Sequence, residues 1–148
     1  MPETYAWEMF SKGLEALERD QAFLALSCLE QAKPLRENPL YCSSLALCLA
    51  KTRNAHDEAK SLCREAMNND RGNPTHYLHL GRILMLAGEK KKAVKTFREG
   101  LKHGNDPRII RELDNLGLRR PPIFPSLDRS HPLNKFGGLL MSRLGCRN

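Results

Sequence analysis

Three Asx-Pro dipeptides recur at nearly constant spacing, and this repeat constrains the fold more than any other feature of the sequence. They are Asn38-Pro39, Asn73-Pro74 and Asp106-Pro107, separated by 35 and 33 residues. An Asx side chain accepts hydrogen bonds from the open N–H groups at the start of a helix, and proline is favoured at the first helical position. A helix that begins at each of these regularly spaced dipeptides predicts a stack of helical hairpins.

Residues 74–107 show the pattern of one hairpin most clearly. Apolar and small residues form a helical stripe in each half of this segment, and Gly88 and Gly104 end the two helices. The stripes consist of Tyr77, Leu80, Gly81 and Leu84 in the first half and Ala93, Phe97, Gly100 and Leu101 in the second. Because the turn at Gly88 is short, the two helices must lie antiparallel.

Taken together, these stripe residues resemble the pattern of the tetratricopeptide repeat (TPR). Residues 39–73 fit the same pattern with one extra residue in the turn, and residues 6–38 form the most diverged unit. The resemblance implies an all-α fold, a right-handed α-solenoid of three TPR-like helical hairpins at about residues 6–38, 39–73 and 74–107.

The chain after the third repeat divides into two parts. Residues 107–117 carry an amphipathic pattern that predicts a capping helix, which covers the apolar face of the last repeat and completes an array over residues 1–117. Residues 118–148 form a proline-rich, basic tail, in which Pro121, Pro122, Pro125 and Pro132 exclude a regular helix before residue 133. This tail is expected either to pack partly on the array or to dock on a partner or a membrane surface.

Composition excludes several other classes of protein. Of the 148 residues, 41% are apolar and 28% charged, and no apolar run is long enough to cross a membrane. The N-terminus does not resemble a signal peptide, and the five cysteines are odd in number and widely spaced, as expected of thiols in a reducing compartment. We therefore expect a cytoplasmic protein.

No catalytic motif is found in the sequence. It lacks the glycine-rich phosphate loops, the zinc-protease motif and the serine-hydrolase motif. His76 and His79 lie three residues apart on one expected helix, but without further ligands they are expected on the solvated surface rather than around a metal. The chain is thus predicted to be no enzyme and to need no cofactor, metal or small-molecule substrate.

The TPR resemblance implies a concave groove that receives a peptide or helix of another protein. The family positions that project into it are Trp7, Phe10, Leu14, Leu40, Ser43, Leu47, Lys51, Thr75, Leu78, Arg82 and Met85. For Trp7 and Phe10 a place in the core is an equal alternative. The positions that hold a terminal carboxylate in chaperone-binding relatives are occupied by Phe10, Leu14, Ser44, Thr75 and His79, so that mode of recognition is disfavoured.

A second function remains open because the net charge of +7 is concentrated after residue 73. Lys90, Lys91, Lys92 and Lys95 form a basic patch at the start of one expected helix. With the tail, this patch could bind nucleic acid or an anionic membrane surface, but no aromatic residues are interleaved for base stacking. The favoured function is a non-catalytic protein–protein interaction module, an adaptor or assembly scaffold. The sequence leaves open the partner and whether the chain forms a homo-oligomer.

Overall fold

The computed structural model describes residues 2–117, and within that range the chain is all-helical. The α-helices are α1 (Pro2–Glu18), α2 (Ala22–Gln31), α3 (Pro39–Arg53), α4 (His56–Asn69), α5 (Pro74–Leu86), α6 (Lys90–Leu101) and α7 (Pro107–Asn115), with the short 3₁₀ helix η1 (Lys33–Leu35) after α2. The all-α class predicted from the repeat is confirmed. The first repeat begins earlier than expected, because α1 starts at Pro2.

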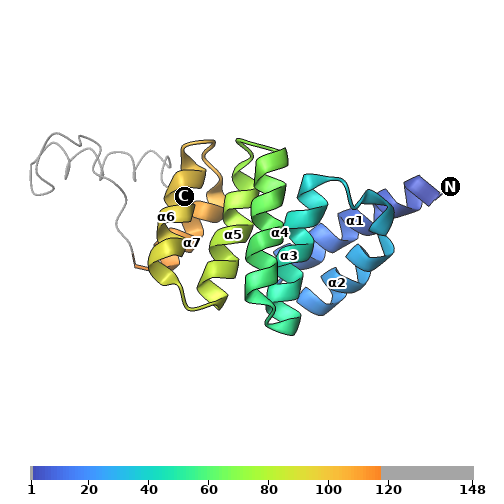
Figure 1. Ribbon diagram of the computed structural model, residues 1–148, viewed down its shortest axis with the longest axis horizontal. Coiled ribbons are helices and arrows are strands. Elements are labelled where there is room, and N and C mark those ends of the chain that lie inside the picture. The colour runs from blue at the N-terminus through green and yellow to red at the C-terminus, as the bar shows by residue number, and fades with distance from the viewer. Residues whose placement is uncertain (1, 118–148) are drawn as a thin grey trace, which may run out of the picture. The chain divides into compact units, whose positions relative to one another are not determined.

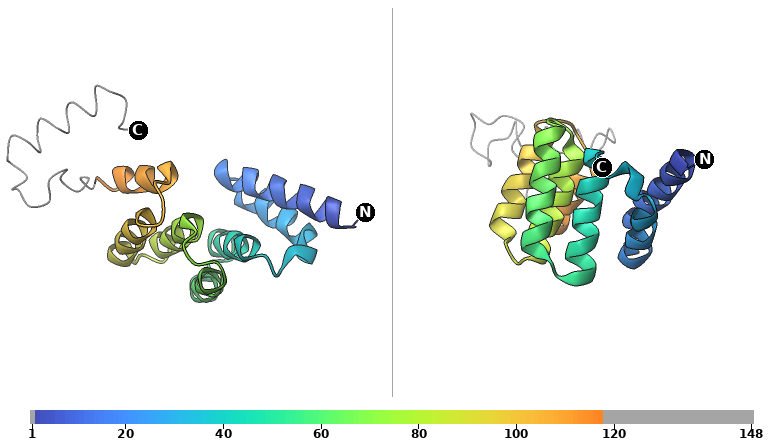
Figure 2. Two further views of the ribbon diagram at one scale, coloured as in Figure 1. Left: turned by 90° about the horizontal axis from the view of Figure 1, so that it is seen from above. Right: turned by 45° about the vertical axis from the view of Figure 1, so that its right-hand side comes forward.

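The chain divides into two compact units, Met1–Ile109 and Ile110–Asn148. Within the first, α1 and α2, α3 and α4, and α5 and α6 form three successive antiparallel hairpins (Figure 1). Each hairpin packs on the next, α2 against α3 and both α3 and α4 against α5. Seen from above, the hairpins of this unit follow one another along an arc (Figure 2). This is the stacked-hairpin array that the repeat predicts.

The three Asx-Pro dipeptides begin helices, as predicted. The Asn38 side chain accepts hydrogen bonds from the N–H groups of Leu40 and Tyr41, at 2.9 and 3.3 Å. Asn73 accepts from Thr75 at 3.0 Å in the same way. Asp106 accepts from the backbone N–H of Arg108 at 2.9 Å. Each helix start is therefore set by its own local sequence.

Close packing of α5 on α6 explains the small residues of the third repeat. A Cβ atom at Gly81 would lie 2.2 Å from the Phe97 ring, and Phe97 is fully buried. A Cβ at Gly100 would lie 2.6 Å from the Cβ of Tyr77. Gly88 ends the turn between the two helices with φ +77°, a conformation that glycine adopts most readily. The two glycines of the helical stripes thus lie where α5 and α6 approach most closely to the neighbouring side chains.

The cysteines behave as the sequence predicts where the structure describes them. Cys28, Cys48 and Cys63 are buried and Cys42 is half-buried, all as free thiols. Burial raises the pKa of the Cys48 and Cys63 thiols to about 12, so both are protonated and unreactive at neutral pH.

The end of the array is described as far as residue 117. Ile109, near the start of α7, is fully buried, and its side chain lies beside Gly100. The expected tail at 118–148 lies outside the described residues, as does Cys146. The tail's two expected placements are therefore not tested. Among residues 2–117, no helix combines the length and apolar character that a membrane span requires.

Candidate partner-binding site

A hollow of about 270 Å³ lies between α1, α3 and α5 in the first unit. Its apolar lining consists of Leu14 and Leu17 from α1 and Leu40 from α3. Thr75 and His79 of α5 are its polar members, and charged side chains adjoin them. The charged members are Glu15, Glu18 and Arg108. The first helices of all three hairpins thus contribute to one surface.

The predicted groove residues fall into two groups. Phe10, Ser43, Leu47 and Leu78 are buried, so in this structure they pack the array and offer no surface to a partner. Trp7 is half exposed, whereas Leu14, Leu40, Lys51, Thr75, Arg82 and Met85 are partly exposed. Of these, the structure brings Leu14, Leu40 and Thr75 together at the hollow.

Trp7 and Phe10 illustrate the division. Phe10 packs between Trp7 and Tyr41, with ring centroids 5.8 and 6.1 Å away, and belongs to the core as the alternative interpretation held. Trp7 keeps half of its surface exposed. The two aromatic residues therefore do not form one exposed patch.

The expectation that His76 and His79 lie on the solvated surface is wrong. Both are buried in α5, because α5 packs against α3 and α4 and is enclosed on that side. They converge on a serine rather than on a metal. Ser43 Oγ lies 2.8 Å from His76 Nδ1 and 3.0 Å from His79 Nδ1.

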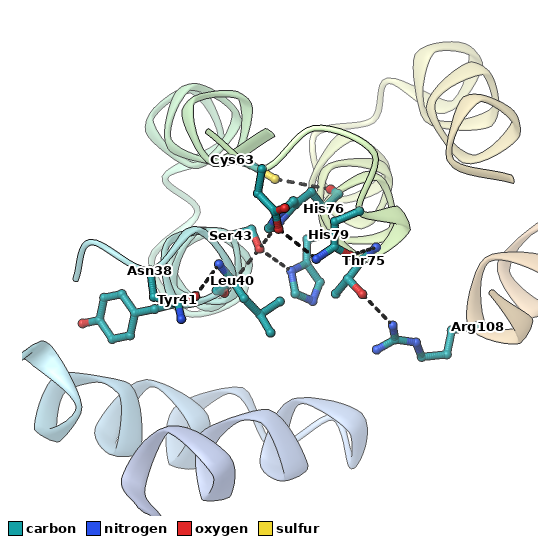
Figure 3. A network of polar contacts seen from close by, with 11 residues as sticks. Asn38, Leu40, Tyr41, Ser43, Cys63, Thr75, His76, His79 and Arg108 are labelled. Atoms are coloured by element: carbon teal, nitrogen blue, oxygen red, sulfur yellow. Dashed lines mark hydrogen bonds and ion pairs between the residues drawn. The ribbon is translucent and has the colours of Figure 1, made fainter. Parts of the chain in front are cut away.

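An acidic residue completes this polar chain. Asp70, which follows α4, lies 2.9 Å from His76 Nε2 through its Oδ2 atom. Hydrogen bonds from Asn73 and His76 lower the pKa of Asp70, so it is a carboxylate at neutral pH. We call the buried residues His76, Ser43 and His79, together with the partly exposed Asp70, the buried polar relay. Figure 3 shows the contacts of Ser43 with both histidines.

The relay contains Asp, His and Ser, as hydrolase triads do, but its serine is inaccessible. Ser43 and His76 have no exposed surface, so a substrate cannot reach the hydroxyl group. The hydrogen bonds instead join α3, α5 and the turn after α4. Among residues 2–117, no three His, Cys, Asp or Glu side chains are grouped as a metal site would require.

Burial also determines the charge of His79. Desolvation, reinforced by the positive charges of Arg82 and Arg108, lowers the pKa of His79 to about 3. The imidazole that lines the hollow is therefore neutral across the physiological pH range.

Arg108 is held beside the hollow by several partners. Its guanidinium group donates to Asp106 at 2.7 Å, to Glu18 at 2.8 Å and to the Thr75 hydroxyl at 3.0 Å. The Glu18 contact joins residues 90 positions apart, from the first helix to the start of the last. No local sequence pattern could have predicted it. His79, by contrast, is spaced from Thr75 and Arg82 as a residue on the same helix face and could have been included in the predicted groove.

Lys51 is also paired, with Asp20 at the end of the α1–α2 turn. The hydrogen bond from Lys51 lowers the pKa of Asp20. Arg108 and Lys51 thus already have acidic partners within the array.

The predicted basic patch is on the surface. Lys90, Lys91, Lys92 and Lys95 are all exposed on α6. Glu89, which precedes them, accepts from Lys60 at 2.8 Å and from Lys92 at 2.6 Å, and these contacts lower the pKa of Glu89 to about 2. Glu89 thereby offsets part of the positive charge at the start of α6.

A second, larger hollow of about 400 Å³ lies where η1 and α3 meet α4. It is lined by Arg36, Glu37, Pro39, Cys42, Glu65, Ala66 and Asn69. Most of these side chains are polar or charged, so the hollow lacks the apolar lining typical of a binding pocket. The smaller hollow is the better candidate site.

Comparison with known proteins supports the fold assignment. The tetratricopeptide repeat family model matches residues 52–111. No curated protein matches the sequence significantly. Over these residues the match agrees with the tetratricopeptide repeat pattern of the sequence and with the stacked hairpins of the structure.

Solved TPR domains have the same fold. The Arabidopsis OM64 TPR domain is 22% identical with a TM-score of 0.58, over 78% of this chain and 97% of that chain. The second TPR domain of human RPAP3, in complex with the HSP70 peptide SGPTIEEVD, is 17% identical with a TM-score of 0.56, over 80% and 100%. The Sgt2 TPR domain from Aspergillus fumigatus is 18% identical with a TM-score of 0.54, over 88% and 93%.

Proposed function

We propose that this chain is a non-catalytic protein–protein interaction module that binds a peptide or helix of a partner in the hollow between α1, α3 and α5. The observation that carries the proposal is the convergence of Leu14, Leu40 and Thr75 on one partly open surface. These residues come from three different hairpins, and all occupy positions that project into the groove in the TPR family. The RPAP3 complex supports the proposal because it shows this fold holding a peptide.

The charges around the hollow favour an apolar partner segment over an acidic one. Arg108 is bound to Asp106 and Glu18, and Lys51 to Asp20. A carboxylate of the partner would have to displace these internal acids, so its ion pair would add little to the free energy of binding. Apolar contacts with Leu14 and Leu40 form without breaking any ion pair.

The test begins with selection of binding peptides from a random displayed library, followed by calorimetric titration against two charge-matched variants. Leu40→Arg places a cation in the hollow, whereas Ser61→Arg adds the same charge at an exposed position on α4. We expect Leu40→Arg to weaken binding at least about tenfold, which corresponds to about 1.4 kcal/mol, and Ser61→Arg to leave it unchanged.

Equal effects of the two substitutions would contradict the proposal. Loss of binding on replacing Lys90, Lys91, Lys92 and Lys95 by glutamine, with strong salt dependence, would favour the alternative of nucleic acid or an anionic membrane surface. Cytoplasmic localisation stays a prediction.

A further inference from the structure

The buried polar relay determines which atom His79 presents to the hollow. The relay starts at the Asp70 carboxylate, which can only accept hydrogen bonds, so His76 Nε2 carries the proton of that 2.9 Å contact. An imidazole that carries its single proton on Nε2 accepts a hydrogen bond at Nδ1. The Ser43 hydroxyl donates to it at 2.8 Å.

The proton between Ser43 and His79 can be placed in the same way. Ser43 has a single hydroxyl hydrogen, and the contact with His76 is shorter than the 3.3 Å to the Leu40 carbonyl oxygen. With that hydrogen used, Ser43 Oγ can only accept from His79, so His79 Nδ1 donates across 3.0 Å. A neutral imidazole has one N–H, and His79 Nε2 is therefore an acceptor.

This acceptor faces the hollow. Figure 3 shows the His79 ring lying between Leu40 and Thr75, with the edge remote from Ser43 turned toward α1. Leu14, Leu17 and Leu40 supply the apolar lining beside it. The hollow thus combines an apolar wall with one hydrogen-bond acceptor of fixed orientation.

The size of the hollow suits a single large side chain. Its volume of about 270 Å³ is just below the ~300 Å³ at which small-molecule sites begin. A serine or threonine side chain would leave much of it empty.

Charge and hydrogen bonding exclude most of the remaining side chains. Lysine or arginine would bring a cation toward Arg108 and Arg82, whose charges already act on His79. The two acids of the lining are already paired, Glu15 with Arg19 and Glu18 with Arg108. Ionised aspartate and glutamate have no proton to donate to Nε2. Phenylalanine and leucine would cover the Nε2 acceptor without offering it a donor, which costs free energy.

We propose that the hollow is an anchor pocket for an aromatic side chain with a hydrogen-bond donor, tyrosine or tryptophan, whose O–H or N–H donates to His79 Nε2. This inference rests on the proposed function, because the anchor residue belongs to the bound partner segment. His79 and the three leucines then set the specificity of the site, and the relay positions His79.

The direct test is an NMR titration of the wild-type protein with matched amino-acid amides. The probes are N-acetyltyrosinamide, N-acetyl-O-methyltyrosinamide and N-acetylphenylalaninamide. We expect the tyrosine amide to bind about five- to tenfold more tightly than either of the others, as one buried hydrogen bond predicts, with shifts centred on Leu14, Leu40 and His79. Equal affinities, or no shifts at these residues up to the solubility limit, would overturn the inference.

A second measurement tests the proton positions without any ligand. Long-range ¹H–¹⁵N correlation of the imidazole groups should show His79 protonated at Nδ1, and protonation at Nε2 would overturn the inference. The variant His79→Leu should abolish the preference for tyrosine over phenylalanine while retaining phenylalanine binding. If this variant does not fold, the titration of the wild-type protein with the three amides and the tautomer of His79 still test the inference.

The two proposals fail in different ways. If selected peptides lose affinity with Leu40→Arg but carry no donor-bearing aromatic anchor, the inference fails and the interaction function stands. If Leu40→Arg has no effect on any selected peptide, the proposed function itself fails.

Discussion

At the scale of single residues, the main feature of this protein is a set of polar side chains enclosed by helices. Sequence spacing indicates that His76 and His79 share a helix face, but it does not show that the face is covered. Once covered, each ring needs a partner, because an unpaired buried polar group costs free energy. Ser43 supplies that partner for both rings.

Burial of His79 predicts that stability depends on pH. In the unfolded chain this histidine titrates near 6.5, whereas burial holds its folded pKa at about 3. Below pH 6.5 the unfolded state binds a proton that the folded state does not bind. The free energy of unfolding, which is highest above pH 6.5, therefore decreases as the pH falls toward 3. We expect this residue to lower the free energy of unfolding by about 2 kcal/mol between pH 7 and pH 5.

Urea denaturation at a series of pH values measures this effect. The control is His79→Leu, which removes the titrating group. The free energy of unfolding of the variant should depend less on pH over this interval by about the same 2 kcal/mol. Identical pH dependence in the two proteins would contradict the assignment.

At the scale of elements, α3, α5 and α7 each begin at a side-chain cap, and packing between helices adds a second requirement. Asn38, Asn73 and Asp106 cap their helices with their own side chains. Packing adds a condition that only the neighbouring helix imposes, as at Gly81 beneath the Phe97 ring. The two contributions can be separated by substitution.

The cap at Asn38 should account for about 1 kcal/mol of stability. Asn38→Ala removes the acceptor for the N–H groups of Leu40 and Tyr41 and should lower the urea midpoint without changing the slope. Asn38→Asp keeps an acceptor and should retain most of the stability. An alanine variant as stable as the wild type would show that the cap is dispensable.

Gly81→Ala should destabilise the array by about 1–3 kcal/mol, although alanine is the better helix former. The added methyl group would clash with the Phe97 ring, and that ring has no exposed side toward which to move. Gly13→Ala is the matched control, because its Cβ would lie 3.2 Å from the Leu29 side chain. Chemical denaturation should give a clearly smaller loss for Gly13→Ala than for Gly81→Ala. Equal losses would contradict this account of α5–α6 packing.

At the scale of the whole array, stacking brings distant residues to one surface. The hollow draws residues from α1, α3 and α5, and Arg108 reaches it from the start of α7. The contact of Arg108 with Glu18 joins the first and last parts of the Met1–Ile109 unit. Such a surface belongs to no single repeat.

The composition of that surface predicts poor binding of acidic chaperone tails. We expect the peptide SGPTIEEVD to bind this protein at least about 100-fold more weakly than it binds the second TPR domain of human RPAP3. The physical reason is that Phe10, Leu14 and Thr75 replace carboxylate-binding side chains and Arg108 is already bound to acids. Fluorescence polarisation with the labelled peptide measures both affinities, and comparable values would contradict the prediction.

The repeat and the starts of α3, α5 and α7 could be predicted from the sequence, because each depends on near neighbours along the chain. Asn38 caps a helix through the N–H groups of Leu40 and Tyr41, which follow it directly in the sequence. The sequence also identified Leu14, Leu40 and Thr75 as residues of one face through the family pattern.

The accessibility of those residues, and the residues that complete the surface, depend on how the hairpins pack and could not be predicted from the sequence. Leu47 and Leu78 are enclosed by neighbouring helices, and His79 is buried against Ser43, since burial depends on the distance and angle between hairpins. Glu18 and Arg108 meet across 90 residues of chain because stacking fixes where each hairpin lies. Neither result is encoded in the spacing of residues along one helix.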